Sequence, residues 1–270
     1  MNNLTRNKTT HMRVHRSDLG FRDGNRGTHT SRTIMSAELG LLLEHLPNDA
    51  GREDYRRAVI EDNVLGKRTG ATRKLSFQRL RELYGLDPDI PLFRYLRFLW
   101  GVDQEGRPLL AFLCAYARDP LLRMTAPAVL DAALGTSVDK HDLEKILSEA
   151  APDRFNPSIL NKIARNAASS WTQSGHLKGR SRKQRVRPHA TPGAAAMALF
   201  IGCLEGLRAQ RLFNTLWTRL LDVPLHRLQD LTLEAARRSW LDFLQADTVV
   251  EIRFPDRLTP QEEKWTYEPA

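Results

Sequence analysis

The most constraining stretch of this sequence is residues 154–187, which contain nine basic side chains and no acidic one. The order of these residues predicts a helix followed by a short hairpin. Asn156 is a favourable helix N-cap, and Pro157 suits the first helical position, where its missing N–H would have no intrahelical acceptor. Gly175 is expected to end the helix. A charge run alone is commonly a solvated face or a flexible loop, but the capped helix and the hairpin spacing favour nucleic-acid binding here.

The predicted helix is amphipathic. Its apolar side chains recur at three- and four-residue spacing and so share one face, namely Leu160, Ile163, Ala164, Ala167 and Trp171. The opposite face has amides, hydroxyls and cations without a carboxylate, which suits base edges and phosphates in a major groove. We predict nucleic-acid contacts from Asn161, Lys162, Arg165, Ser169 and Thr172.

The predicted hairpin comprises two short segments, 176–178 and 184–186, on either side of the basic residues 179–183. A helix followed by a basic hairpin is the order of a winged helix-turn-helix, with the helix for the groove and the wing for the flanking backbone. We interpret His176 as a wing contact or a packing residue, not a general base. The predicted backbone contacts are Lys178, Arg180, Arg182, Lys183 and Arg185.

A second amphipathic helix is predicted over 140–150, capped by Ser137 or Asp139. The turn 151–155 separates it from the helix at Pro157, as a helix-turn-helix requires. Apolar spacing predicts further helices at 34–46, 52–64, 71–84, 92–100, 109–117, 127–134, 193–204, 212–221, 225–231 and 233–244, and alternation predicts a strand at 248–254. The expected fold class is mainly α, multi-helical, with a winged helix-turn-helix and short β-hairpins.

Proline, glycine and polar stretches divide the chain into expected domains. These are an N-terminal helical domain at 34–105, the winged helix-turn-helix at 106–190, a C-terminal helical domain with one short strand at 191–258, and a loose tail at 259–270.

Residues 1–33 have few large apolar side chains, so we expect a disordered basic arm. Such an arm would add non-specific DNA affinity; alternatively, the segment results from an upstream, mis-chosen start codon. The histidines His11, His15 and His29 have no regular ligand spacing and no partner cysteine, so metal binding is not expected.

A second basic group follows the predicted helix at 52–64. Lys67, Arg68 and Arg73 lie in or beside a basic turn between two predicted helices and are expected to meet phosphates. The alternative is a helical-bundle face, with the cations balanced by Glu61, Asp62 and Glu82.

The basic charge is concentrated in the sequence. Of the formal net charge of +9, residues 1–33 carry +5 and residues 154–187 carry +9, which leaves −5 on the rest. Such clustering is typical of an electrostatic footprint on a polyanion. No apolar run is long enough to span a membrane, and no signal peptide is recognisable. Cys114 and Cys203 lie in apolar contexts, as expected for reduced thiols in a cytoplasmic protein.

The sequence lacks the motifs of common enzyme classes. It contains no glycine-rich phosphate loop, GxSxG elbow, HExxH motif or clustered catalytic carboxylates. Glu61 and Asp62 are adjacent on a predicted helix, so their side chains diverge and are poorly placed for one metal ion. No catalytic residue, cofactor, metal ion or small-molecule substrate is predicted.

Three stretches resemble the BrxA family of bacteriophage exclusion (BREX) defence systems. They are EDNVLGKRTGAT from Glu61, RNAASSWTQSGHL from Arg165, and LFNTLW from Leu212. The resemblance spans most of 34–255 and leaves out residues 1–33. It implies a mostly helical, non-enzymatic DNA-binding protein that acts beside the other proteins of such a defence system. Early comparisons likened that family to an RNA-binding antitermination factor, so RNA is the alternative nucleic acid.

Two further functions remain as alternatives. The basic hairpin could dock an acidic partner subunit, in which case the protein is an adaptor. A transcriptional regulator is the other alternative, although such proteins are typically symmetric dimers and no heptad dimer element is evident.

Overall fold

The computed structural model describes residues 15–24, 26–180, 182–246 and 249–267. Helices dominate these residues and are accompanied by two separate antiparallel strand pairs. The predicted fold class, mainly α with short β-hairpins, is therefore confirmed.

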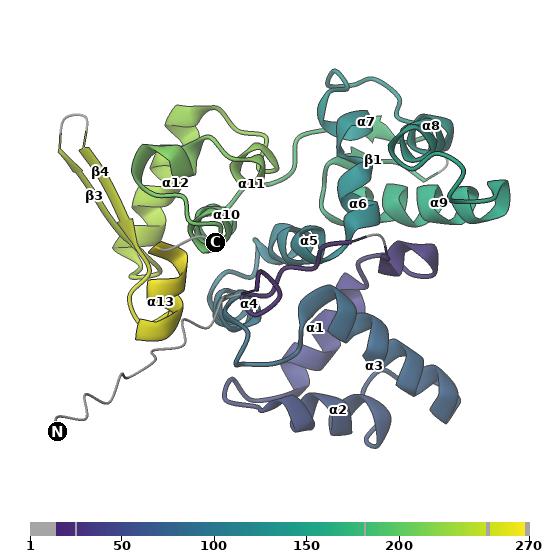
Figure 1. Cartoon of the computed structure of the whole chain (residues 1–270), viewed down its shortest axis with the longest axis horizontal. Helices are drawn as coiled ribbons and strands as arrows, with labels where there is room; N and C mark the ends of the chain where they lie inside the picture. Colours follow the sequence, from purple (N-terminus) through teal and green to yellow (C-terminus); the bar gives the residue numbers. More distant parts are fainter. Residues whose placement is uncertain (1–14, 25, 181, 247–248, 268–270) are drawn as a thin grey trace, which may run out of the picture.

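Helix α5 (Arg107–Arg118) lies at the centre of the molecule (Figure 1). Every side chain from Leu109 to Arg118 is buried, as expected for a helix that is apolar on nearly all sides. It packs against α3 (Gly70–Tyr84), α4 (Pro91–Val102), α9 (Pro157–Gln173) and α10 (Pro192–Leu204). The buried apolar residues form one continuous cluster, so α5 joins the expected N-terminal and central domains rather than separating them.

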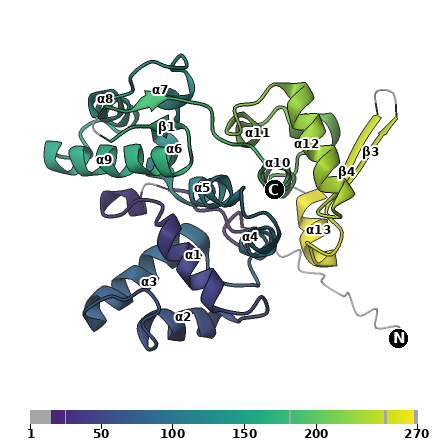
Figure 2. The same cartoon turned by 180° about the vertical axis from the view of Figure 1, so that it is seen from behind.

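Helices α1 (Ser36–His45), α2 (Arg52–Ile60) and α3 lie together on one side of α5 (Figures 1 and 2). The helices predicted at 34–46, 52–64 and 71–84 are thus present. The second is shorter than predicted because the chain turns through Asn63 and Gly66, whose φ angles are 56° and 61°.

The prediction of a disordered arm is wrong for residues 15–24 and 26–33; residues 1–14 lie outside the described part. Leu19 and Phe21 are buried in the common core, and the short 3-10 helix η1 (Thr28–Thr30) packs on α9. Few apolar side chains are present, but buried polar contacts of Thr28 and His29 compensate for the ordering entropy.

The central part contains the predicted helices and hairpin, together with one helix that was not predicted, α6 (Pro120–Met124). The predicted elements are α7 (Ala126–Leu130), α8 (Lys140–Ala150), α9, β1 (Leu177–Lys178) and β2 (Gln184–Arg185). Asp139 caps α8, where its side chain accepts hydrogen bonds from the N–H groups of His141 and Asp142. Asn156 caps α9 by accepting a hydrogen bond from Ile159 N at 2.9 Å. Helix α7 stops at Leu130, four residues before the predicted end.

The C-terminal part surrounds the fully buried helix α10. It contains the 3-10 helix η2 (Ala209–Phe213), α11 (Leu216–Arg219), α12 (Leu225–Arg237), β3 (Asp242–Ala246), β4 (Val249–Arg253) and α13 (Pro260–Tyr267). The single helix predicted at 212–221 is broken, because Thr215 caps a new helix, α11, by accepting a hydrogen bond from Thr218 N.

Two predictions fail near the C-terminus. Residues 225–237 form one helix, and 242–246 form a strand instead of the end of a helix. The helix stops because Ser239 adopts a left-handed φ of 58°, after which β3 pairs with the predicted strand. The expected loose tail contains α13, which is fixed by the ion pair of buried Glu262 with Arg94 at 2.5 Å.

No helix in the described ranges is long and apolar enough to cross a membrane.

Candidate nucleic-acid interface

Helix α9 is anchored through its apolar face. Ile163, Ala164, Ala167 and Trp171 are buried, as the spacing predicts. The Trp171 ring lies 4.6 Å from that of Phe112, and its Nε1–H donates to Thr125 Oγ1 at 2.8 Å. The helix is therefore held rigidly, which fixes the direction of its opposite face.

On the opposite face, only part of the predicted contact set is accessible. Lys162 and Arg165 are exposed, and Ser169 and Thr172 are half-buried on the same side. Asn161 points elsewhere: its side-chain amide donates to Glu144 Oε1 of α8 at 3.0 Å. Asn161 therefore contributes to the packing of α8 on α9, and its prediction as a groove contact is corrected.

A three-stranded arrangement supports the hairpin. Leu177 pairs with Arg185 and Lys178 with Gln184 across β1 and β2. Residues 135–138 lie along the other edge of β2, where Val138 N donates to the Lys183 carbonyl at 2.9 Å and Arg185 N to the Thr136 carbonyl at 2.9 Å. The hairpin is thereby tied to the segment that leads into α8.

Arg185 is buried and cannot contact a nucleic-acid backbone, which corrects the prediction that it makes such a contact. Cross-strand partners share one face of a sheet, and the partner of Arg185 is the buried Leu177. The Arg185 side chain is 2% exposed; it donates to the Val129 carbonyl at 2.8 Å and pairs with Asp222 Oδ2 at 2.7 Å. Arg185 therefore fastens the hairpin to the C-terminal part.

The Lys183 side chain contacts the end of helix α9. Its Nζ donates to Thr172 Oγ1 at 2.7 Å, so the hairpin is held against the end of α9. Partial burial lowers the pKa of Lys183. The contact between Lys183 and Thr172 thus positions the hairpin loop. Lys183 also lines an open groove.

A groove of about 610 Å³ lies between the start of α8, the exposed face of α9 and the hairpin loop. Its lining includes Arg165, Arg180, Lys183, Ser169 and Lys140. Lys140 was missed in the sequence, although it is the first residue after the predicted cap of the helix at 140–150. The one carboxylate in the lining, Asp139, is occupied as the helix cap by backbone N–H donors.

Five exposed cations lie in or beside this groove without an acidic partner, whereas Lys140 in its lining pairs with Glu144 at 3.6 Å. Across the described ranges, no carboxylate forms an ion pair with any of five residues, Lys162, Arg165, Lys178, Arg180 and Arg182. Some exposed arginines elsewhere have one: Arg56 pairs with Glu61 at 2.6 Å and Arg219 with Asp131 at 2.5 Å. The arrangement therefore suits an external anion.

The second basic group is largely occupied by internal contacts. Lys67 pairs with Glu38 at 3.2 Å, and the Arg73 guanidinium donates to the Lys67 and Ile60 carbonyls. Arg68 is exposed. Lys67 and Arg73 therefore close the loop between α2 and α3, which leaves Arg68 as the exposed residue of the three predicted contacts.

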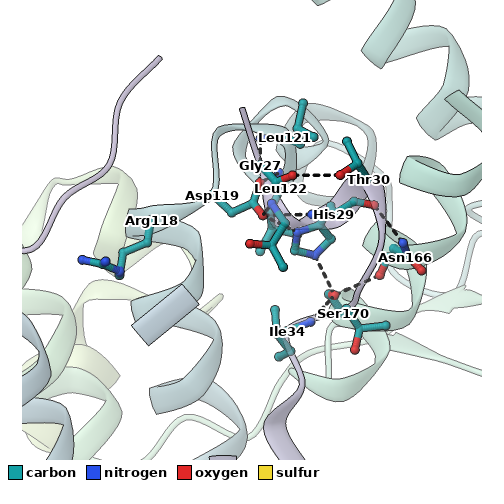
Figure 3. A network of polar contacts seen from close by, with 12 residues as sticks. Gly27, His29, Thr30, Ile34, Arg118, Asp119, Leu121, Leu122, Asn166 and Ser170 are labelled. Atoms are coloured by element: carbon teal, nitrogen blue, oxygen red, sulfur yellow. Dashed lines mark hydrogen bonds and ion pairs between the residues drawn. The ribbon is translucent and has the colours of Figure 1, made fainter. Parts of the chain in front are cut away.

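A buried polar network links the N-terminal segment to α9 (Figure 3). His29 Nδ1 lies 2.8 Å from Asp119 Oδ2, and His29 Nε2 lies 2.8 Å from Ser170 Oγ. Asn166 donates to the His29 carbonyl at 2.8 Å, and Ile34 N donates to Ser170 Oγ at 3.0 Å. The network holds residues 27–34 against one side of α9.

The order Asp119, His29, Ser170 has the connectivity of a hydrolase triad, but all three side chains are fully buried. A substrate therefore has no access to the Ser170 hydroxyl in this structure. Burial opposes ionisation of Asp119, yet His29 and backbone N–H donors lower the pKa of this carboxyl. The carboxylate is thus a structural acceptor for the N-terminal segment.

His176 is a packing residue, one of its two predicted interpretations. It is fully buried against Trp171, with Nδ1 2.8 Å from Ser174 Oγ and Nε2 2.8 Å from the Leu220 carbonyl. Burial lowers the pKa of His176 to about 3. The ring is therefore neutral at physiological pH.

The cysteines are buried thiols. Burial raises the pKa of Cys114 to about 12 and also raises that of Cys203. Within the described ranges, no group of three or more His, Cys, Asp or Glu side chains is arranged to hold a metal ion.

No protein-family model matches this chain, and no curated protein matches its sequence.

Proposed function

We propose that this protein binds duplex DNA through α9, the start of α8 and the β1–β2 hairpin. The observation that carries the proposal is the set of five exposed cations without acidic partners, all on α9 or the hairpin beside one groove. Phosphates are the anions that such a distributed set of lysines and arginines binds, because each contact releases condensed counterions.

The arrangement supports an interpretation of residues 120–186 as a winged helix. Helices α6 and α7, the extended residues 135–138, helices α8 and α9, and the β1–β2 hairpin follow one another in the order of that motif. In this interpretation α9 enters the major groove through Lys162 and Arg165, while Lys178, Arg180 and Arg182 meet the flanking backbone.

The resemblance to the BrxA family supports a proposal for the cellular setting of this activity. We propose that the protein is a non-enzymatic component of a BREX-type anti-phage system and acts beside other proteins of that system. The support is the resemblance of the three sequence stretches, one of which, from Arg165, covers the C-terminal half of α9.

The proposal is tested by equilibrium binding to labelled duplex DNA, duplex RNA and single strands at one fixed salt concentration. The triple variant Arg165→Ala/Arg180→Ala/Arg182→Ala should bind duplex DNA at least about tenfold more weakly. Lys264→Ala, an exposed cation on the distant α13, is the matched control and should bind like the wild type.

The other outcomes separate the alternatives. Tighter binding to duplex RNA than to duplex DNA would replace DNA with RNA as the ligand. Absence of binding to every nucleic acid would contradict the proposal, and capture of an acidic defence-system protein that depends on the same three arginines would instead support an adaptor.

A further inference from the structure

A second pocket, remote from α9, has the features of a small-molecule site. It lies between α2, α4 and the loops that contain Asn48 and Pro88, and its volume is about 350 Å³. Its walls include the rings of Tyr55, Phe93 and Phe98 and the side chain of Val102. A cavity of about 150 Å³ holds benzene, so this pocket has room for a body of one or two fused rings.

Arg97 places a buried positive charge in the pocket wall. The residue is 8% exposed, and its Nη2 donates to the Leu46 carbonyl at 2.6 Å. Its Nε is buried without a hydrogen-bond partner, and no carboxylate pairs with it among the residues described. A buried cation without a counter-ion is costly, because water no longer solvates it.

Tyr55 places a phenol hydroxyl beside Arg97 in the same wall. The ring is fully buried, stacks edge-on against Phe93 with 5.3 Å between ring centroids, and its hydroxyl has no hydrogen-bond partner. Burial raises the pKa of Tyr55, and the nearby Arg97 guanidinium opposes that rise. The hydroxyl and the guanidinium are therefore close neighbours.

Two other buried or half-buried arginines differ from Arg97 in how their guanidinium groups are compensated. Arg118 is also buried without a carboxylate, but its Nε and both terminal nitrogens donate to backbone carbonyls. Arg94, in the same pocket wall, pairs with Glu262 and donates to the Pro88 and Arg257 carbonyls. Arg97 is the guanidinium in the pocket wall that lacks such compensation.

We propose that this pocket binds a small organic anion, a carboxylate on an aromatic body. The carboxylate pairs with the Arg97 guanidinium, and the aromatic body packs between Phe93, Phe98 and Val102. Apolar walls with a few convergent polar groups are typical of such sites. The proposal is independent of nucleic-acid binding.

The test is calorimetric titration of the full chain with naphthalene-2-carboxylate and with the uncharged naphthalene-2-carboxamide. The carboxylate should bind saturably and at least about tenfold more tightly than the amide. The reason is that a hydrogen bond between a guanidinium and a carboxylate is stronger than one between a guanidinium and a neutral amide. Arg97→Met, which retains the apolar stem, should remove this preference.

Two variants exclude trivial explanations. Val102→Trp fills the pocket without changing any charge and should abolish binding, even if Arg97→Met proves too unstable to assay. Arg165→Met removes an exposed guanidinium of the α9 face and should leave binding unchanged. Equal affinity for the amide, binding retained in Val102→Trp, or no saturable binding below about 10 mM would overturn the proposal.

Discussion

His29 Nε2 lies 2.8 Å from Ser170 Oγ, and this contact connects the N-terminal segment to the helix that carries the proposed DNA contacts. The opposite ring nitrogen faces the Asp119 carboxylate, which also accepts hydrogen bonds from the Thr28 and His29 N–H groups at 2.6 and 3.1 Å. Residues 27–34 thus form a buried brace along α9.

Replacement of His29 should release this brace. His29→Ala leaves Asp119 and Ser170 with unmade buried contacts, so we expect a loss of about 3 kcal/mol in unfolding free energy. Urea denaturation measures the loss, and faster tryptic cleavage at Arg22, Arg26 or Arg32 reports local release. His45→Ala, at an exposed histidine of α1, should change neither; an equally stable His29→Ala protein would contradict the structural role.

Arg185 and Lys178 should have opposite phenotypes, although they lie on paired strands. Arg185→Ala leaves Asp222 and several carbonyls without their donor, and we expect about 3 kcal/mol of destabilisation. Lys178→Ala should change stability by less than about 0.5 kcal/mol, since its side chain is exposed, but should weaken DNA binding. The structure would be contradicted by an Arg185→Ala protein with wild-type stability and impaired DNA binding.

Gly179 is required by the geometry of the hairpin loop. Its φ is 117°, and a Cβ atom there would lie 2.2 Å from the Arg182 carbonyl oxygen. Gly179→Ala should therefore displace the loop, with a cost of about 1 kcal/mol or more in stability and a weaker affinity for DNA. Gly70→Ala, where a Cβ atom meets nothing within 4 Å, is the control; it should keep or slightly raise stability and leave DNA affinity unchanged.

The lowered pKa of His176 should make the folded state sensitive to acid. Its pKa of about 3 in the folded protein lies below the ordinary value of 6.5, so the unfolded chain binds the proton more readily between these values. Stability is consequently lost as the pH falls below 6.5, by up to about 1.4 kcal/mol per pH unit from this group.

Denaturation of the wild type and His176→Gln at pH 7.5, 6.5, 5.5 and 4.5 measures this contribution. The variant should be less stable at pH 7.5, because it loses ring packing on Trp171. Its stability should nevertheless fall less steeply, with about 2.7 kcal/mol separating the two losses by pH 4.5. Parallel curves for the two proteins would show that His176 does not titrate as described.

Local signals in the sequence were sufficient to predict helices α8 and α9. Asn156, Pro157 and Asp139 act within three residues of themselves, so the starts of α8 and α9 follow from the local chain alone. The exposure of Lys162 and Arg165 also follows, because it is opposite a face fixed by Ile163 and Trp171.

Long-range partners explain what the sequence did not predict. Asp119 lies 90 residues from His29 along the chain and Asp222 lies 37 residues from Arg185, so no local pattern distinguishes these buried residues from solvated ones. The two-residue strands were also too short to show which of Lys178 and Arg185 points inward, and the pairing register decides it.

The central claim, that α9 and the hairpin bind DNA phosphates, is tested most directly by the salt dependence of affinity. Fluorescence anisotropy gives the dissociation constant for a labelled duplex across a salt series, for the wild type, Arg165→Ala/Arg180→Ala/Arg182→Ala, and Lys264→Ala. We predict a steep log–log slope for the wild type and for Lys264→Ala, and a slope about three smaller for the triple variant, about one for each lost phosphate contact. A triple variant with the wild-type slope and affinity would contradict the account.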